Sequence, residues 1–361
     1  MKKLFYFAAA AVALAACAKN EVIPVNSGEN QEITFNVAPK TKANPEPKKD
    51  AFSTDNVFAS WAYYLPKDKT WDANWKEAVE YIGTEHVGST ISFNNNVWKD
   101  QTTSYYWPKE GFLTFFAYSL NSNKLAETVG ECFFYCEKEE ASAEVPNDQY
   151  GISGILNLDA HPNTDFLVAD VAYDKTANEE KYNFTGVPTL FRHRLSRVQF
   201  AVKKNADYAN TKITLNSITF NHLSCGMTYT QFLKDSEGNF SESITPSTDY
   251  KPQEYTKTNF VVDSHEFVTI PVANEVRYIY IPQNFKTVNT TATINVTYIV
   301  TYKTGISETY TRTINVKDIF DSWEMGKKYT FNLIFSLNEI TWAPAVQDWD
   351  VEGTTVNKTV A

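Results

Sequence analysis

The residues with the clearest chemical potential stand at the start of the chain, where a cysteine closes an apolar segment. Met1-Lys2-Lys3 gives a basic start, and Leu4 to Ala16 is an apolar run of 13 residues. A membrane-spanning helix needs about 20 such residues, whereas a short run with positive charge before it and small residues at its end is typical of a secretory signal peptide. The sequence therefore predicts export, with residues 1–16 as the signal peptide and the thiol of Cys17 at the cleavage point.

Leu14-Ala15-Ala16-Cys17 resembles the lipobox of bacterial lipoproteins. The resemblance implies that signal peptidase II cuts between Ala16 and Cys17, and that Cys17 then carries fatty acyl chains such as palmitate on its sulfur and its new amino group. Two or more chains anchor a protein stably in a membrane. The alternative is an ordinary cleaved signal peptide with a chance cysteine at its end. We expect a lipoprotein of the outer membrane, with the polar residues 17–30 as a lipidated tether.

Other chemistries lack the spacing that they require. Thr269 stands where a zinc protease that began at His265-Glu266 would have its second histidine, and Gly151-Ile-Ser-Gly154 lacks the frame of a serine nucleophile elbow. The five histidines are scattered, and no Cys/His spacing indicates zinc. We therefore expect no enzyme, no catalytic residue, no metal and no cofactor.

Three cysteines remain after the anchor. Cys132 and Cys136 are four residues apart, which in a strand separates their Cα atoms by about 13 Å. A disulfide spans at most about 7 Å between Cα atoms. A bridge between these two is excluded if the stretch is a strand, and a bridge from either one to Cys225 is left open.

A basic cluster between the two halves of the chain has two interpretations. Arg192, His193, Arg194 and Arg197 could bind an anion or an acidic glycan, or they could be the exposed residues of a strand. We favour the exposed strand, because surface charge runs are usually solvated faces.

The tryptophans also have two interpretations. Trp71, Trp75 and Trp98 lie in the least patterned region and could stack on sugar rings. However, a chain with 15% aromatic residues needs bulky side chains to fill its core. We favour a core role for all three.

Length and charge narrow the class of protein. About 345 residues follow the signal peptide. A single hydrophobic core rarely supports a chain of that length, so two domains are expected. The net charge of −10 gives the chain no overall attraction to nucleic acid.

Alternating apolar residues predict strands along most of the chain. The expected strands are Ile33–Val37, Val57–Leu65, Phe112–Leu120, Phe133–Cys136, Asp165–Asp170, Val198–Val202, Val276–Ile281, a hairpin of Ala292–Tyr302 with Tyr310–Val316 around Gly305, and Tyr329–Leu337. Ile213 and Leu215 are out of phase with Ile218 and Phe220, which predicts a bulge near Asn216.

Few other elements are expected. The spacing of Trp71, Trp75, Ala78, Val79 and Ile82 predicts a helix with Asp72 in its first turn, and Ile319–Trp323 predicts one helical turn. Residues 137–164 read mostly as loop. No βαβ series occurs, which favours an all-β protein of two sandwich domains, residues 31–186 and 187–361.

Several stretches in this order resemble the Mfa-like fimbrillin family of Bacteroidales, whose members are surface lipoproteins and type V pilins. The stretches are Trp61-Ala-Tyr63, Tyr106-Trp-Pro108, Leu113-Thr-Phe-Phe-Ala-Tyr118, Asp165-Phe-Leu-Val-Ala169, Phe191-Arg-His-Arg-Leu-Ser196, Tyr280-Ile-Pro-Gln283 and Trp323-Glu-Met-Gly-Lys-Lys-Tyr329. The resemblance implies two β-sandwich domains of transthyretin-like topology and a stalk, tip or anchor subunit of adhesive fimbriae. It also implies partner subunits that bind by strand exchange, after a protease removes the first strand, here Ile33, Phe35 and Val37.

The basic residues of the early chain bear on that cleavage. No arginine precedes Arg192, so a strictly arginine-specific protease could not cut between the first strand and the body. The basic targets in the early loop are Lys40, Lys42, Lys48 and Lys49. Either maturation occurs at these lysines, or the subunit stays uncut and lipid-anchored. The competing function is a monomeric, lipid-anchored surface protein that binds glycans. A host or bacterial surface receptor or glycan is a further candidate partner.

Overall fold

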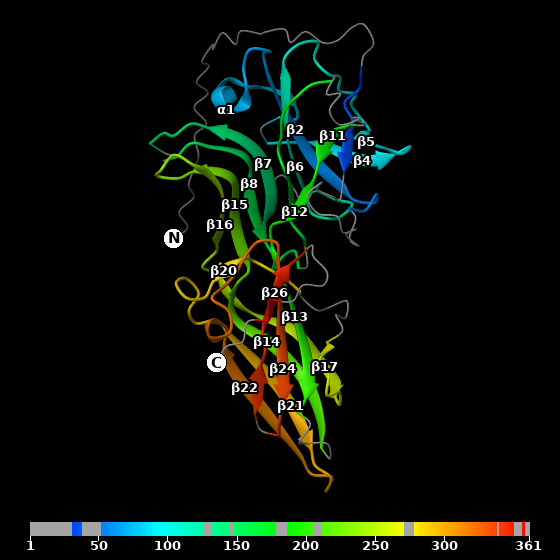
Figure 1. The fold of residues 1–361 in the computed structure, drawn as a ribbon, viewed down its shortest axis with the longest axis vertical. Coiled ribbons are helices and arrows are strands. Elements are labelled where there is room, and N and C mark those ends of the chain that lie inside the picture. The colour runs from blue at the N-terminus through cyan, green and yellow to red at the C-terminus, as the bar shows by residue number, and fades with distance from the viewer. Residues whose placement is uncertain are drawn as a thin grey trace, which may run out of the picture.

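The computed structural model describes residues 31–37, 52–84, 86–125, 131–143, 147–162, 164–177, 186–205, 211–270, 278–337, 339–349 and 356–357. The described chain is nearly all β and forms an elongated molecule with two parts, one above the other in Figure 1. Cys17, the early lysines and most of the tail after Trp349 lie outside the described residues. Within the described residues, no helix combines the length and hydropathy needed to cross a membrane.

The upper part is built around a ten-stranded sheet that curls back on itself. Its strands are β1 (Phe35–Val37), β2 (Val57–Leu65), β3 (Val79–Ile82), β4 (Ser89–Asn94), β5 (Val97–Asp100), β6 (Phe112–Ser119), β9 (Leu167–Ala169), β10 (Ala172–Lys175), β11 (Val187–Thr189) and β12 (Phe191–His193). The strand order β11-β1-β5-β4-β2-β6-β9-β12 places β11 and β12 at opposite ends, with β10 and β3 on side branches. Because only Leu190 separates β11 from β12 in the sequence, the two ends of the sheet must meet.

A second sheet covers the outside of this curled sheet. It contains β7 (Cys132–Glu139), β8 (Gln149–Asn157), β15 (Gly226–Lys234) and β16 (Phe240–Pro246), in the order β16-β15-β8-β7. Strand β2 explains how the layers are joined. Ala59, Trp61 and Tyr63 face the core between the two sheets, while Phe58 and Ala62 face the core inside the curl.

The lower part is a sandwich of two sheets. One holds β13 (Ser196–Lys204), β18 (Val268–Thr269), β19 (Ile279–Tyr280), β24 (Lys327–Phe335), β25 (Ile340–Trp342), β26 (Ala345–Asp348) and β27 (Val356–Asn357). The other holds β14 (Lys212–Ser224), β17 (Tyr250–Val262), β21 (Thr293–Thr301) and β22 (Ser307–Asn315), in the order β17-β14-β21-β22. Alternate residues of both sheets, such as Phe200, Phe220 and Phe331, fill one core between them.

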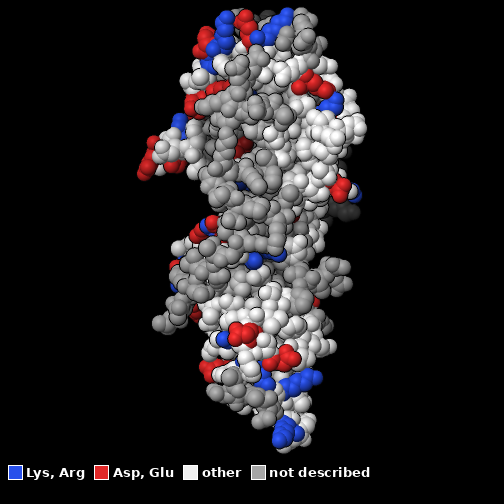
Figure 2. Space-filling view, turned by 45° about the vertical axis from the view of Figure 1, so that its right-hand side comes forward, with Lys and Arg blue, Asp and Glu red and all other residues white. Residues whose placement is uncertain are grey.

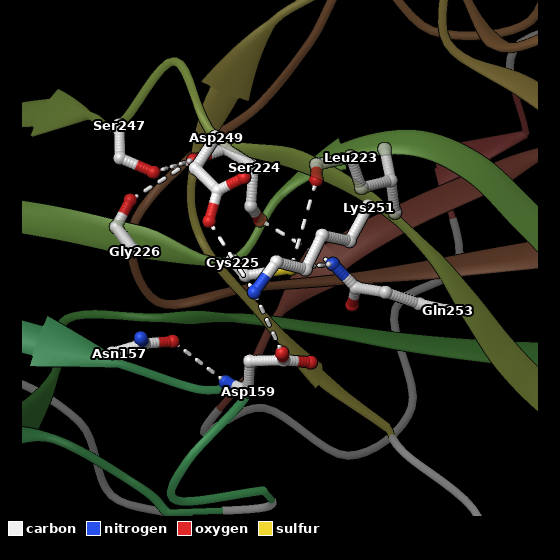
Figure 3. A network of polar contacts seen from close by, with 10 residues as sticks. All are labelled: Asn157, Asp159, Leu223, Ser224, Cys225, Gly226, Ser247, Asp249, Lys251 and Gln253. Carbon is white, nitrogen blue, oxygen red and sulfur yellow. Dashed lines mark hydrogen bonds and ion pairs between the residues drawn. The ribbon is translucent and has the colours of Figure 1, made fainter.

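A two-stranded ribbon runs from the lower part into the upper part. Only Cys225 separates β14 from β15, and residues 247–249 separate β16 from β17. At the crossing, Gln253 Nε2 donates to Cys225 Sγ at 3.0 Å, and Lys251 Nζ pairs with Asp159 Oδ2 at 2.9 Å (Figure 3). Gln283 belongs to a further two-stranded sheet, β20 (Gln283–Asn284) with β23 (Ser322–Trp323), and accepts a hydrogen bond from the Ser224 N–H. The crossing is therefore hydrogen-bonded from several sides.

The all-β prediction is confirmed, and several elements fall where the pattern placed them. Strand β2 has the predicted bounds, and the hairpin β21–β22 turns through Gly305, whose φ of 86° suits glycine. The bulge in β14 is also confirmed, because its pairing with both neighbours shifts register between Leu215 and Ser217.

Two predicted elements are wrong, and one strand was not predicted. The helix that begins at Trp71 stops early: α1 covers Trp71–Asn74, the 3₁₀ turn η1 covers Trp75–Glu77, and Val79–Ile82 pairs with β2 as a strand. Residues 137–164 lie mostly outside strands, as expected, but they include a strand that was not predicted, β8 at Gln149–Asn157, which is an inner strand of its sheet. Ile319–Trp323 is not a helical turn, because the 3₁₀ turn η4 lies earlier, at Val316–Asp318.

Strand pairing crosses the predicted boundary between residues 186 and 187. β11 and β12 belong to the curled sheet, and β15 and β16 pair in the upper part with β8. The chain thus enters the lower part at β13, returns to the upper part at β15, and comes back at β17.

Charges of both signs are interspersed at the upper end of the molecule (Figure 2).

Candidate assembly site

The predicted removable strand lies inside the curled sheet. β1 pairs in parallel with β11, in the register Phe35–Val187 and Val37–Thr189, and pairs antiparallel with β5 through Phe35 and Trp98. Backbone hydrogen bonds extend this pairing before the strand, from the Ile33 N–H to the Tyr105 oxygen at 2.7 Å and from the Trp107 N–H to the Gln31 oxygen at 3.1 Å. β1 therefore satisfies backbone groups on both of its sides, as a central strand does.

The side chains of this segment complete the core inside the curl. Ile33 and Phe35 are 3% and 4% exposed. The Phe35 ring meets Phe58 and Phe115 edge to face, with ring centroids 5.4 and 5.9 Å away. Full burial of side chains of this size contributes about 1.5–3 kcal/mol each to stability. Because β1 lies between β5 and β11, loss of the segment would leave an apolar slot with an unpaired strand edge on each side.

Polar contacts fix the start of the segment. Lys99 Nζ lies 2.9 Å from both carboxylate oxygens of Glu32, and the Ser104 hydroxyl donates to the same group at 2.8 Å. The hydrogen bond from Lys99 holds the pKa of Glu32 below its usual value. Because the segment is only a few residues long, we infer that this ion pair helps to fix the register of β1 against its neighbouring strands.

Gly186 allows the parallel neighbour to approach closely. Its φ is 141°, and a Cβ atom there would lie 2.8 Å from the Thr34 carbonyl oxygen. A side chain at this position would collide with the backbone of the first segment. The Thr34 oxygen accepts the Val187 N–H at 2.7 Å, directly beside this contact. Sequence analysis missed Gly186, and its only local signal was a glycine before a short strand.

The slot also brings together aromatic residues that the sequence keeps apart. Phe52 stacks on Phe191 with ring centroids 4.8 Å apart, and Trp98 packs against both Phe52 and Phe58. Trp98 is thus a wall of the slot. Trp71 and Trp75 are buried in the other upper core, at 0% and 7% exposure. None of the three presents a ring for sugar stacking, so this part of the glycan hypothesis is wrong and the core role is confirmed.

The basic cluster is engaged in structural contacts. Arg192 pairs with Asp170 through two hydrogen bonds of 2.7 and 2.8 Å, and Arg194, largely buried, lies 2.7 Å from Glu242. His193 lies 3.0 Å from Asp165 and stacks on Trp349. The guanidinium of Arg197 lies 5.6 Å from the centre of the Tyr278 ring. The cluster therefore joins the strands around β12 and β13. The favoured interpretation as an exposed strand face is correct for Arg192 but wrong for Arg194, which is buried, and His193 and Arg197 are half-buried.

All three described cysteines, Cys132, Cys136 and Cys225, are buried thiols. The bridge to Cys225 that the sequence left open is therefore not formed. Burial raises the pKa of the Cys136 thiol well above its ordinary value. Among the described residues, no group of three or more His, Cys, Asp and Glu side chains is placed to hold a metal ion.

These features define a class: an elongated protein of β-sandwiches whose first strand fills a slot between two other strands. A family model described as fimbrillin-like matches residues 50–349. The chain belongs to the fimbrillin-like family, which confirms the resemblance seen in the sequence. The match begins after the segment Ile33–Val37, so it does not itself cover the first strand.

Solved structures include similar folds. A fimbrial protein from Bacteroides vulgatus aligns with a TM-score of 0.56 and 16% sequence identity, over 89% of this chain and 100% of that one. The fimbrial anchor protein Mfa2 from Porphyromonas gingivalis aligns over 91% of this chain and 100% of its own, with 15% identity and a TM-score of only 0.28. A search of curated protein sequences found no significant match.

Proposed function

We propose that this protein is a structural, non-enzymatic subunit of cell-surface fimbriae that serve adhesion, and that subunits join by strand exchange at the β1 slot. The observation that carries the proposal is the position of Ile33 and Phe35, which are buried between β5 and β11 yet belong to the N-terminal end of the described chain. Membership of the fimbrillin-like family and similarity to a fimbrial protein support the fimbrial role.

The slot has the two properties that strand exchange requires. Its floor is apolar, and its walls are strands with backbone groups that need partners. An extended segment from another subunit would gain main-chain hydrogen bonds for affinity and side-chain pockets for specificity. The pockets of Ile33 and Phe35 require large apolar residues two positions apart, because alternate residues share one face. For the strand order of the domains we propose the transthyretin-like topology that the family resemblance implies.

We further propose how the subunit is anchored before assembly and how it is released. Acylation at Cys17 would hold the exported chain at the outer membrane, with residues 17–30 as the tether. Cleavage at Lys40, Lys42, Lys48 or Lys49 would release the body and leave the first strand behind, which suits a stalk subunit. An uncut chain would keep both lipid and strand, which suits an anchor or a tip. Neighbouring subunits and a surface receptor or glycan are the proposed partners.

Two truncations test strand exchange. One variant begins at residue 31 and keeps β1, and the other begins at Phe52 and lacks it. We expect the first to remain monomeric and the second to form oligomers that survive mild heating in detergent gels. A synthetic peptide of residues 30–38, added during refolding, should occupy the slot and suppress those oligomers.

The same experiment can fail clearly. A variant from Phe52 that folds as a monomer and does not bind the peptide would contradict strand exchange at this slot. A peptide with Phe35→Asp serves as the matched control, because it keeps the backbone and the length but cannot fill the apolar pocket. Mass spectrometry of the N-terminus of the surface protein then distinguishes a lipid-bearing Cys17 from cleavage after one of the lysines.

A further inference from the structure

One sheet face of the lower part is almost free of charge. The outward side chains of β14, β21 and β22 alternate with the inward ones that fill the core. On the outward face lie Lys212, Thr214, Ser217, Thr219, Asn221, Thr293, Asn295, Thr297, Ile299, Thr301, Ser307, Thr309, Thr311, Thr313 and Asn315. All but Lys212 and Ile299 are serine, threonine or asparagine. We call this set the hydroxyl face.

The side chains of the hydroxyl face are ordered in rows across the strands. Thr297 and Thr311 hydroxyls are 3.0 Å apart, and those of Thr301 and Ser307 are 2.8 Å apart. The Thr313 hydroxyl donates to Asn295 Oδ1 at 2.8 Å. Because each pair is directly opposite in the strand register, the rows repeat along the hairpin. The result is a surface that is polar but carries no carboxylate.

Charge returns at the margins of this face. Lys212 lies at one end, and Glu254 of β17 stands beside Thr219. The two charged residues of β22, Glu308 and Arg312, lie opposite Val300 and Val296 and so face inward, away from the hydroxyl face. Inward charges on an edge strand discourage strand-to-strand pairing. The edge of β22 is thus protected, whereas the outward side chains of β21 and β22 are neutral.

We propose that the hydroxyl face is a lateral contact between copies of this chain. The chain has a net charge of −10, so two copies repel each other over most of their surfaces. Here the outward side chains of β21 and β22 include none that is charged, so two such faces can meet without like-charge repulsion. The cores of protein interfaces are depleted in charged residues, with the charges at the rim, which is the arrangement seen here.

The size of the face predicts that one contact is weak. Three strands of about nine residues cover about 30 by 14 Å, or roughly 400 Å². A stable complex buries about 800 Å² on each partner. Single copies should therefore stay apart in solution, whereas rows of copies should associate through many contacts at once. This inference rests on the proposed function only in that fimbriae would supply such rows.

Clustering of coated beads tests the contact without fimbriae. The exported chain is coupled by its N-terminus to beads at high density, and bead clusters are counted. We expect wild-type beads to cluster and Thr311→Glu to reduce clustering about tenfold or more, since one repulsion is repeated at every contact. Thr245→Glu on β16 is the matched control, because it adds the same charge to another exposed strand threonine, away from the hydroxyl face, and should cluster as wild type does.

Charge complementation sharpens the test. Beads with Thr311→Glu mixed with beads with Thr311→Lys should cluster with each other, because opposite charges then meet across the contact. Equal clustering of Thr311→Glu and wild type would overturn the proposal, as would wild-type beads that never cluster. Wild-type beads that bind only a neutral polysaccharide surface, such as dextran, would overturn it in favour of a glycan partner. None of these outcomes depends on strand exchange, so the two proposals can fail separately.

Discussion

At the scale of single residues, this protein depends on aromatic side chains that reach across its layers. Phe35 contacts Phe58 and Phe115 from a strand of only three residues. Because the backbone pairing of β1 is so short, we infer that packing of its side chains contributes most of the free energy that keeps β1 in the sheet. Under the proposed strand exchange, an incoming strand would have to replace these side chains.

Phe35→Ala should destabilise the protein by about 3–5 kcal/mol, because it leaves a cavity in a buried aromatic cluster. Urea unfolding followed by tryptophan fluorescence measures the change. Val37→Ala, at a half-buried position of the same strand, is the control and should cost much less. A loss below about 1 kcal/mol for Phe35→Ala would mean that β1 is already detached in the free subunit.

The ionisation of Asp148 should make the free energy of unfolding depend on pH. The carboxylate accepts the Ala141 N–H at 2.9 Å and lies 3.0 Å from Lys234 Nζ and 3.4 Å from Lys76 Nζ. The hydrogen bond from the Ala141 backbone, followed by that from Lys234, lowers the pKa of Asp148 to about 2. In the unfolded chain an aspartate titrates near 3.9, so the ionised form favours the folded state.

The stability that this group contributes should be complete above about pH 4 and lost as the pH falls toward 2. Urea midpoints at a series of pH values should therefore fall less steeply over this window in Asp148→Asn than in wild type. Asp249→Asn, which removes the same charge at an exposed site, should keep the wild-type slope. Parallel curves for wild type and Asp148→Asn would contradict the assignment.

At the scale of elements, the bulge in β14 sets which residues face the core. Ile213 and Leu215 before it, and Ile218 and Phe220 after it, are all fully buried. They can share one face only because an extra residue resets the alternation at Asn216. Both neighbouring strands shift at the same place, so the bulge belongs to β14 itself.

Deletion of Thr219, which lies after the bulge, should abolish folding of the lower sandwich, because the one-residue slip turns every later side chain of β14 to the opposite face. The expected result is insoluble protein or loss of the cooperative unfolding transition. Deletion of Asn216 itself would instead leave Ile218 two positions after Leu215, so the buried residues would stay on one face. Asn216→Ala keeps the residue count and should fold, with a loss of no more than about 2 kcal/mol. Soluble, cooperative protein from the Thr219 deletion would show that β14 can repair its register.

At the scale of the whole molecule, the ribbon β14–β15 and β16–β17 ties the two parts together. The strands continue across the crossing with one residue between β14 and β15. Leu195, Met227 and Tyr229 pack in the upper core although they come from the second half of the chain. A load applied along a fimbria would therefore pass through continuous hydrogen-bonded strands rather than through a single flexible linker.

Because the parts share these strands, we expect heat to unfold them together. Calorimetry should give one transition whose van't Hoff and calorimetric enthalpies agree. Leu156→Ala in the upper core and Leu333→Ala in the lower core should each move that single transition to lower temperature. Two resolved transitions, each sensitive to one variant only, would contradict the coupling.

Local patterns could predict much of the fold. Strand β2, the hairpin around Gly305 and the bulge at Asn216 follow from alternation, because side chains in a strand point to opposite faces in turn. The helix predicted from Trp71 is wrong for two reasons. Trp71 and Trp75 have helical spacing, but they lie in two short helical turns that place both rings in a core. Val79–Ile82 then pairs with β2 as a strand instead of continuing the helix. β8 was missed because Gly151, Ser153 and Gly154 interrupt its apolar pattern, and its strand form depends on neighbours at both sides.

The sequence by itself determined the all-β class and the family resemblance, and it predicts the export signal with the cysteine at its end, since these depend on residue types at short spacing. Only the tertiary structure decided that β1 lies between β5 and β11, that Trp98 is a wall of that slot, and that one sheet face carries rows of hydroxyls. These features join residues that are far apart in the chain. Their contacts depend on which strands become neighbours, and strand order is set by packing of the whole molecule rather than by any local pattern.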